Sequence, residues 1–175
     1  MLWVSEIIDT ALDNRLDAEG IRPGSTDGLS GILVAPLLHG GFGHLVANTL
    51  PLLVLGFLVL LAGLRQWLAV TVIVWTVGGV GTWLTGGEGP VHLGASGLIF
   101  GWLTYLVLRG LFTRNAMEIL VGVFVFLVYG GTLLGVLPGQ PGISWQGHLF
   151  GAVGGALAAW WLPTRRQPAE YAIGR

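Results

Sequence analysis

Five long apolar segments constrain the fold of this chain more than any other feature of its sequence. They lie at about 44–64, 66–85, 95–113, 116–137 and 145–162. A helix of about 20 mainly apolar residues is long enough to cross the roughly 30 Å hydrocarbon layer of a membrane. The sequence therefore predicts an all-α polytopic membrane protein, in which short connections make neighbouring helices antiparallel.

The composition agrees with a membrane protein and excludes several other classes. Only 10% of the residues are charged and 53% are hydrophobic, whereas a soluble domain has about 25% charged residues. Cysteine is absent, which excludes disulfides, a thiolate nucleophile and a cysteine-based metal site. The basic residues are scattered arginines and the formal net charge is −1, so no surface for nucleic acid is expected.

The region before the first span has a different character. Residues 1–12 read as the last turns of a helix whose beginning is missing, and they show no cleavable signal. Residues 13–28 are polar and acidic, and residues 29–43 are apolar but too short and too rich in Gly and Pro to cross a membrane. We expect a long loop that dips into the membrane interface.

The distribution of charge predicts the orientation of the bundle. The ends of alternate spans carry arginine, at positions Arg65, Arg109, Arg114, Arg165, Arg166 and Arg175. The opposite ends are mainly acidic. By the positive-inside rule the arginine-rich side and the C-terminus are cytoplasmic, and the long acidic loop lies outside.

Three polar clusters fall on the predicted outer side, where lipid makes polar groups costly. His44 and Asn48 lie four residues apart on one helix face, Ser96 lies in GASG, and His148 lies near the start of the last span. Polar residues in spans are functional candidates by default. Small residues follow Ser96 and His148 at helical spacing, so their two helices can approach closely enough for a hydrogen bond.

A serine beside a histidine base is an arrangement for acyl transfer. No carboxylate lies in the outer half of a clear span, so the sequence predicts a two-residue Ser–His unit rather than a triad. His44 and Asn48 supply side-chain donors at the same depth, of the type that stabilises a developing oxyanion.

These motifs together resemble the rhomboid family of intramembrane serine proteases. The resemblance covers about residues 29–162 and rests on a histidine followed by a second histidine and an asparagine, then GxSG, then a GHxxGAxxG-like run. It implies that Ser96 is the nucleophile and His148 the general base. The oxyanion site would be formed by His44, Asn48 and the backbone N–H of Ser96.

The resemblance also assigns roles to the motif residues around this pair. It places Gly94 and Gly97 in the serine motif, and Gly151 and Gly155 where the histidine helix packs beside the serine helix. Phe100 occupies a position where the family often has a tyrosine that stacks on the base. The Trp-Arg pair that many relatives carry in the long loop is not found, and Arg22 is the nearest basic residue.

The fold that the resemblance implies is a six-helix bundle whose first helix is truncated here. We expect one rhomboid-like membrane domain over 1–175, with a remnant of helix 1 at 1–12, a partly embedded loop at 13–43, five transmembrane helices over 44–162 and a cytoplasmic tail at 163–175. The implied activity is cleavage of transmembrane-segment substrates near the outer face of a bilayer, without cofactor or metal. The arginine-only basic composition is typical of a GC-rich bacterial genome and favours a bacterial plasma membrane.

Other interpretations of the same residues stay open. Ser96 alone would fit a helix N-cap or an interhelical hydrogen bond. A catalytically silent rhomboid-like protein that binds transmembrane helices is the alternative function, and a metal or haem site from His39, His44 and His148 is a further one. His39 is expected to hold the turn HGGFG, and His92 to be solvated or at the headgroups.

Overall fold

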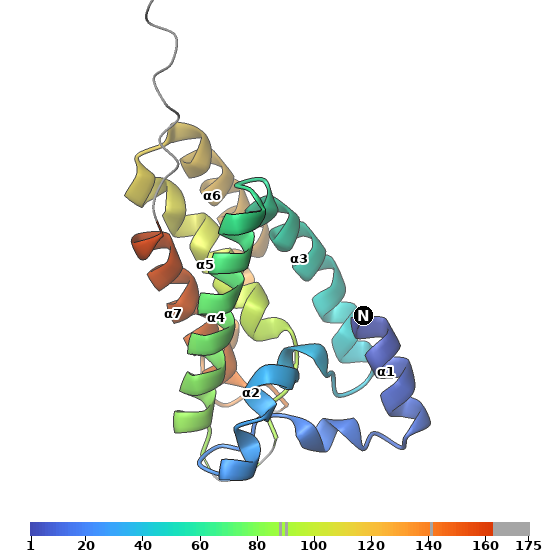
Figure 1. The fold of residues 1–175 in the computed structure, drawn as a ribbon. Helices are drawn as coiled ribbons and strands as arrows, with labels where there is room; N and C mark the ends of the chain where they lie inside the picture. The colour runs from blue at the N-terminus through green and yellow to red at the C-terminus, as the bar shows by residue number, and fades with distance from the viewer. Residues whose placement is uncertain (88, 90, 141, 163–175) are drawn as a thin grey trace, which may run out of the picture.

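The computed structural model describes residues 1–175 except 88, 90, 141 and 163–175, and its elements are helices (Figure 1). The α-helices are α1 (Leu2–Ala11), α2 (Gly31–Val34), α3 (Phe42–Leu60), α4 (Leu64–Thr85), α5 (Ser96–Thr113), α6 (Ala116–Tyr129) and α7 (Trp145–Trp161). The 3₁₀ helices are η1 (Leu16–Glu19), η2 (Thr26–Gly28), η3 (Ala35–Leu37) and η4 (Gly130–Val136). The predicted tail at 163–175, with Arg165, Arg166 and Arg175, lies outside the described residues.

The apolar helices confirm the prediction of an all-α polytopic membrane protein. Within the described residues, four helical segments are long and apolar enough to cross a membrane: α3, α4, α5 and α6 with η4, of 19, 22, 18 and 21 residues. The fifth predicted span is α7, which is shorter at 17 residues. Their boundaries follow the five apolar segments of the sequence closely.

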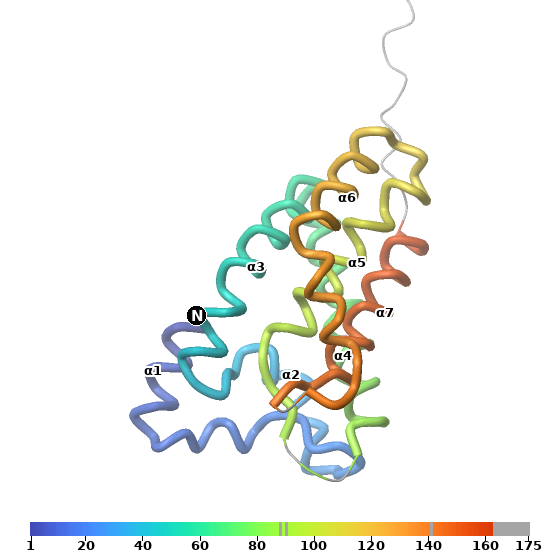
Figure 2. Tube along the Cα trace, turned by 180° about the vertical axis from the view of Figure 1, so that it is seen from behind, coloured from blue at the N-terminus to red at the C-terminus, as the bar shows by residue number. Residues whose placement is uncertain are grey.

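Helix α5 is the centre of the bundle, with α3, α4, α6 and α7 packed around it (Figures 1 and 2). In its most apolar stretch 56% of the residues are buried, against 11% in the stretch from α6 through η4. Large apolar side chains such as Leu120, Phe124 and Leu127 of α6 are exposed. Because exposed apolar surface of this extent is stable only in an apolar solvent, these side chains face lipid.

The contact between α5 and α7 is built on glycine. A Cβ added to Gly151 would collide with the carbonyl oxygen of Gly97, and one added to Gly155 would collide with that of Gly101. Two helices approach this closely only where side chains are missing. Backbone packing therefore holds the N-terminal halves of α5 and α7 together.

The end of the fourth predicted span departs from a regular α-helix. The sequence predicts one helix over 116–137, but α6 ends at Tyr129 and the chain continues as the 3₁₀ helix η4. Gly130 and Gly131 stand at the change, and glycine is a poor α-helix former. The tighter winding of η4 brings Gly135 to the side of α7.

Residues 12–41, which we call loop 1, cross one end of the bundle (bottom of Figure 1). Two indole N–H groups of α4 donate to its backbone, Trp75 to the Ile32 carbonyl at 2.7 Å and Trp83 to the Ser25 carbonyl at 2.8 Å. The Gly94 N–H donates to the Ala35 carbonyl at 2.9 Å. Loop 1 is therefore hydrogen-bonded to α4 and to the segment just before Ser96.

Candidate active site

The hydroxyl of Ser96 and the imidazole of His148 meet between the first turns of α5 and α7. Ser96 Oγ lies 2.8 Å from His148 Nε2. Ser96 is the first residue of α5 and His148 lies in the first turn of α7, beside the glycine contact described above. The fold therefore brings together two residues that lie 52 positions apart in the sequence.

The second nitrogen of the His148 ring determines which tautomer is present. His148 Nδ1 lies 3.0 Å from the carbonyl oxygen of Gly135. A carbonyl oxygen only accepts hydrogen bonds, so the ring proton is on Nδ1 and Nε2 is left to accept the proton of Ser96. In the described part of the chain a backbone carbonyl thus takes the orienting position that a carboxylate holds in a catalytic triad.

The face of the imidazole is covered by an aromatic ring. Phe100 stacks on His148 with ring centroids 4.0 Å apart and an interplanar angle of 11°. Phe100 lies one turn after Ser96 on α5. The His148 ring is therefore held at its edge by Gly135 and at its face by Phe100.

Gly94 and His44 meet beside the serine. Gly94 has φ +117°, and a Cβ there would lie 2.5 Å from Cε1 of His44. Only glycine adopts this backbone conformation readily and leaves room for the imidazole. His44, at the start of α3, is therefore in contact with the segment that leads into Ser96.

Asn48 lies one turn after His44 on α3 and is buried, with 5% of its surface exposed. Its Nδ2 donates to the His44 carbonyl oxygen at 2.8 Å, so the hydrogen bond that it makes runs along its own helix. The structure therefore places Asn48 on the helix face that carries His44.

His39 contacts Ala95, the residue before Ser96. Its Nε2 accepts a hydrogen bond from the Ala95 N–H at 3.4 Å, and its ring lies edge-on to His44 with centroids 5.2 Å apart. Burial, together with the neighbouring His44, lowers the pKa of His39 to about 4. His39 is therefore a neutral acceptor for Ala95 rather than only a residue of the turn HGGFG.

The prediction that His92 is solvated is wrong. His92 is 8% exposed, and its Nδ1 lies 2.6 Å from Ser144 Oγ. Its backbone also pairs with Ile21 of loop 1. The prediction was wrong because the loop before α5 is covered by loop 1, a contact that no local pattern indicates.

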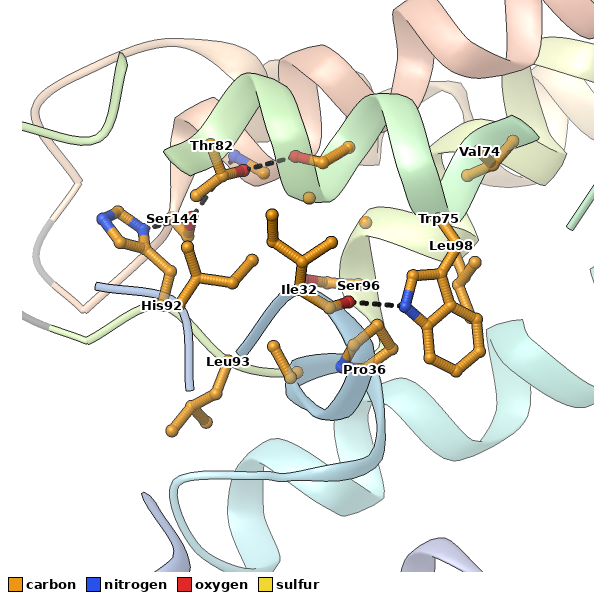
Figure 3. A pocket seen from close by; sticks show the side chains of 17 residues that line it. Ile32, Pro36, Val74, Trp75, Thr82, His92, Leu93, Ser96, Leu98 and Ser144 are labelled. Atoms are coloured by element: carbon orange, nitrogen blue, oxygen red, sulfur yellow. Dashed lines mark hydrogen bonds between the residues drawn. The ribbon is translucent and has the colours of Figure 1, made fainter. Parts of the chain in front are cut away.

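A small cavity of about 50 Å³ reaches Ser96 from the side of α2 and α4 (Figure 3). Ile32 and Pro36 of loop 1 line it, together with Thr82, His92 and Ser144. A cavity of this volume can hold a few water molecules. Water can therefore lie next to the serine in the interior of the bundle.

Two groups at this site were not predicted from the sequence, for different reasons. Gly135 contributes a backbone carbonyl, which every residue type has, so its identity carries no signal. Ser144 accepts from the Gly147 N–H at 3.2 Å and caps α7, and a serine just before an apolar helix is a recognisable cap.

Over the described residues, no group of three or more His, Cys, Asp or Glu is placed to hold a metal ion.

The fold and the site define a class: an all-helical integral membrane protein with a Ser–His pair between two closely packed helices. The chain belongs to the rhomboid family, because the model of the Rhomboid domain matches residues 26–165. That match covers loop 1 from η2 onward and every apolar helix from α3 to α7.

The chain is similar to curated proteins of three bacteria, and the one from Bacillus subtilis carries a rhomboid name. The chain is 52% identical over 178 residues to "Uncharacterized protein Rv1337" of Mycobacterium tuberculosis, covering 97% of this chain and 74% of that protein. It is 50% identical over 184 residues to "Uncharacterized protein ML1171" of Mycobacterium leprae, covering 99% and 73%. It is 29% identical over 146 residues to "Putative rhomboid protease YdcA" of Bacillus subtilis, covering 79% and 70%.

Proposed function

We propose that this chain is an intramembrane serine endopeptidase in which Ser96 and His148 form the catalytic dyad. The observation that carries the proposal is the 2.8 Å contact between Ser96 Oγ and His148 Nε2, with the proton of His148 placed on Nδ1 by the Gly135 carbonyl. A neutral imidazole whose free nitrogen faces a serine hydroxyl is the arrangement of a general base and its nucleophile. Family membership and the name of the Bacillus subtilis relative support the same chemistry.

The reaction follows from this geometry in two stages. Ser96 Oγ attacks the carbonyl carbon of the scissile peptide bond while its proton passes to His148 Nε2. The tetrahedral intermediate collapses to an acyl-enzyme, and His148 returns the proton to the leaving amine. Water then attacks the acyl-enzyme with His148 again as base, which releases the new carboxyl end and restores Ser96.

The negative charge on the carbonyl oxygen needs donors near Ser96. Ser96 is the first residue of α5, and the first N–H groups of a helix have no partner within the helix. The positive end of the helix dipole favours an anion there. We assign the backbone N–H of Ser96, with the side chains of His44 and Asn48, to the oxyanion site.

The substrates that we propose are transmembrane segments of other proteins, cut near the outer face of a bacterial plasma membrane. In this arrangement the domain spans 1–175, loop 1 and the start of α5 face outward, and the Arg109 end of the bundle faces the cytoplasm. Exposed apolar residues around α3 and α6 suit approach of a substrate helix from the lipid. The chemistry requires no cofactor or metal.

The test is labelling of detergent-purified protein by a serine-reactive fluorophosphonate. We expect the native chain to label and both Ser96→Ala and His148→Ala to lose labelling, because the serine is reactive only when a base accepts its proton. Ser30→Ala is the matched control, since Ser30 is exposed and its hydroxyl donates within loop 1 to the Asp27 carbonyl.

Cleavage is then measured with single-pass membrane substrates in proteoliposomes. A folded native chain that neither labels nor cleaves would contradict the proposal and favour the alternative role of a silent protein that binds transmembrane helices. Labelling that persists in Ser96→Ala would contradict the assignment of the nucleophile.

A further inference from the structure

His92 and Ser144 form a second serine–histidine contact next to the dyad (Figure 3). Each lies four residues before a member of the dyad, His92 before Ser96 and Ser144 before His148. Their side chains are joined at 2.6 Å, from His92 Nδ1 to Ser144 Oγ. The segment that leads into the serine is thus hydrogen-bonded to the segment that leads into the base.

The backbone of His92 is fixed by loop 1. The His92 N–H donates to the Ile21 carbonyl at 2.9 Å, and the Ile21 N–H donates to the His92 carbonyl at 2.8 Å. On the other side of the ring, a Cβ added to Gly86 would lie 2.8 Å from Nε2. His92 therefore cannot shift without moving loop 1 or the end of α4.

Ser144 fixes the first turn of α7 through two atoms. Its Oγ accepts from the Gly147 N–H at 3.2 Å, and its carbonyl oxygen accepts from the His148 N–H at 3.1 Å. The Ser144 hydroxyl carries one proton and a second lone pair, so it can pair with His92 Nδ1 as donor or as acceptor, depending on which ring nitrogen of His92 is protonated. Burial lowers the pKa of His92, which favours the neutral ring.

The glycine contacts between α5 and α7 lie on one side of the dyad only. Close packing of Gly97 on Gly151 and of Gly101 on Gly155 holds the helices together after Ser96 and His148 in the sequence. Ser96 and His148 lie in first turns, and helix ends open more readily than helix interiors. The first turns touch each other at Gly97 and the Gly147 carbonyl, and a side-chain contact on the far side of the dyad would add to their register.

We propose that His92 and Ser144 are positioning residues that keep Ser96 Oγ within hydrogen-bond distance of His148 Nε2 by joining the starts of α5 and α7. The inference rests on the proposed function, since it assigns the pair to the same active site. Neither residue forms a bond to the substrate. They act through the geometry of the dyad, where a displacement of about 1 Å can cost about 100-fold in rate.

The test compares fluorophosphonate labelling rates of the native chain, His92→Ala, Ser144→Ala and the double variant, with melting temperatures measured on the same samples. We expect each single variant to label about 10- to 100-fold more slowly. The double variant should be no slower than the slower single variant, because both changes remove the same hydrogen bond. Multiplying effects would overturn the proposal.

A conservative replacement separates positioning from general stability. His92→Asn places a carboxamide, which can accept from or donate to Ser144 Oγ, where the His92 ring pairs with it. We therefore expect it to restore most of the labelling rate. Thr85→Ala is the control, because Thr85 is exposed at the same end of α4 and its hydroxyl donates to the Gly81 carbonyl of its own helix. A native labelling rate in His92→Ala overturns the pair's role, as does failure of His92→Asn to restore labelling.

The two proposals fail in different ways in this experiment. A folded native chain that is not labelled contradicts the proposed protease. A native chain that labels through Ser96, with His92→Ala labelling equally fast, contradicts only the positioning role of His92 and Ser144.

Discussion

The ring of Phe100 lies parallel to the imidazole of His148, with centroids 4.0 Å apart and planes 11° apart. Both rings touch the same short stretch of η4. A Cβ added to Gly135 would lie 3.0 Å from His148 Nδ1 and 3.0 Å from Phe100 Cζ. Residues of α5, α7 and η4 thus define the orientation of the His148 imidazole. The Phe100 ring of α5 supports it through a side chain, and Gly135 of η4 supports it through the backbone.

Replacing Phe100 by leucine should slow labelling of Ser96 without unfolding the chain. Leucine keeps an apolar contact but removes the flat face on which the imidazole rests. Aromatic stacking contributes about 0.5–1.5 kcal/mol beyond area burial, which corresponds to a labelling rate about 2- to 10-fold lower. Phe124→Leu makes the same change on the exposed face of α6 and should leave the rate unchanged. Equal rates for the two variants would contradict the role of the stack.

Replacing Gly155 by alanine should push α5 and α7 apart. The new Cβ would meet the carbonyl oxygen of Gly101, which is part of a helix and cannot rotate away. Overpacking of this kind costs about 1–3 kcal/mol, so we expect a lower melting temperature in detergent and reduced labelling. Gly131→Ala is the control, since a Cβ there meets nothing within 4 Å. A Gly155→Ala protein as stable as Gly131→Ala would show that the two helices do not need this close approach.

The helices of this protein could be predicted from the sequence because lipid imposes a simple rule on them. Each apolar segment of membrane-spanning length became a helix close to the predicted bounds, from α3 at Phe42–Leu60 to α7 at Trp145–Trp161. The spacing of small residues also indicated which helices pack closely. These features depend on the composition of one segment at a time.

The parts of the site that escaped prediction depend on contacts between distant segments. The sequence around His92 indicates an exposed loop, whereas in the structure Ile21 of loop 1 pairs with His92 and covers it. The acceptor for His148 Nδ1 is a carbonyl of η4, and its position depends on the change from α to 3₁₀ winding at Gly130. Arg109 was read only as a marker of orientation, yet it is 8% exposed and lies inside the bundle.

Replacing Arg109 by leucine should destabilise the bundle at the end away from the dyad. One of its guanidinium nitrogens donates to the Leu162 carbonyl at 2.6 Å and to the Ala159 carbonyl at 3.3 Å. These carbonyls belong to the C-terminal end of α7, whose last carbonyls have no partner within the helix. Loss of a donor to buried carbonyls costs about 1–3 kcal/mol for each, so the melting temperature should fall.

The control for Arg109 is Arg65→Leu, which removes an exposed arginine at the same end and should change stability little. Labelling per folded molecule should be unchanged in Arg109→Leu, because Arg109 lies near the other end of α5 from Ser96. A variant that melts like Arg65→Leu would show that the carbonyls of α7 find other donors.

Replacing Asp17 by asparagine should change how stability depends on pH. Burial, with the nearby carboxylates Asp9 and Glu6, raises the pKa of Asp17 from 3.8 to about 6. Between these values the folded chain binds more protons than the unfolded chain, so the contribution of Asp17 to stability falls as pH rises from about 4 to about 6. Above that range the carboxylate is charged in both states and its contribution stays at its lower value.

Asparagine cannot lose a proton, so Asp17→Asn should melt at a higher temperature than the native chain at pH 7.5. Below about pH 4 the two proteins should differ least, since Asp17 is then protonated in the folded and unfolded states. Comparing the variant with the native chain at each pH removes the effect of the titrating groups that do not interact with Asp17. A constant difference in melting temperature between the two proteins across this pH range would mean that Asp17 has the same pKa in the folded and unfolded states. A widening gap from pH 4 to pH 6 would show that the ionised Asp17 carboxylate destabilises the folded chain, through its burial and the nearby carboxylates Asp9 and Glu6.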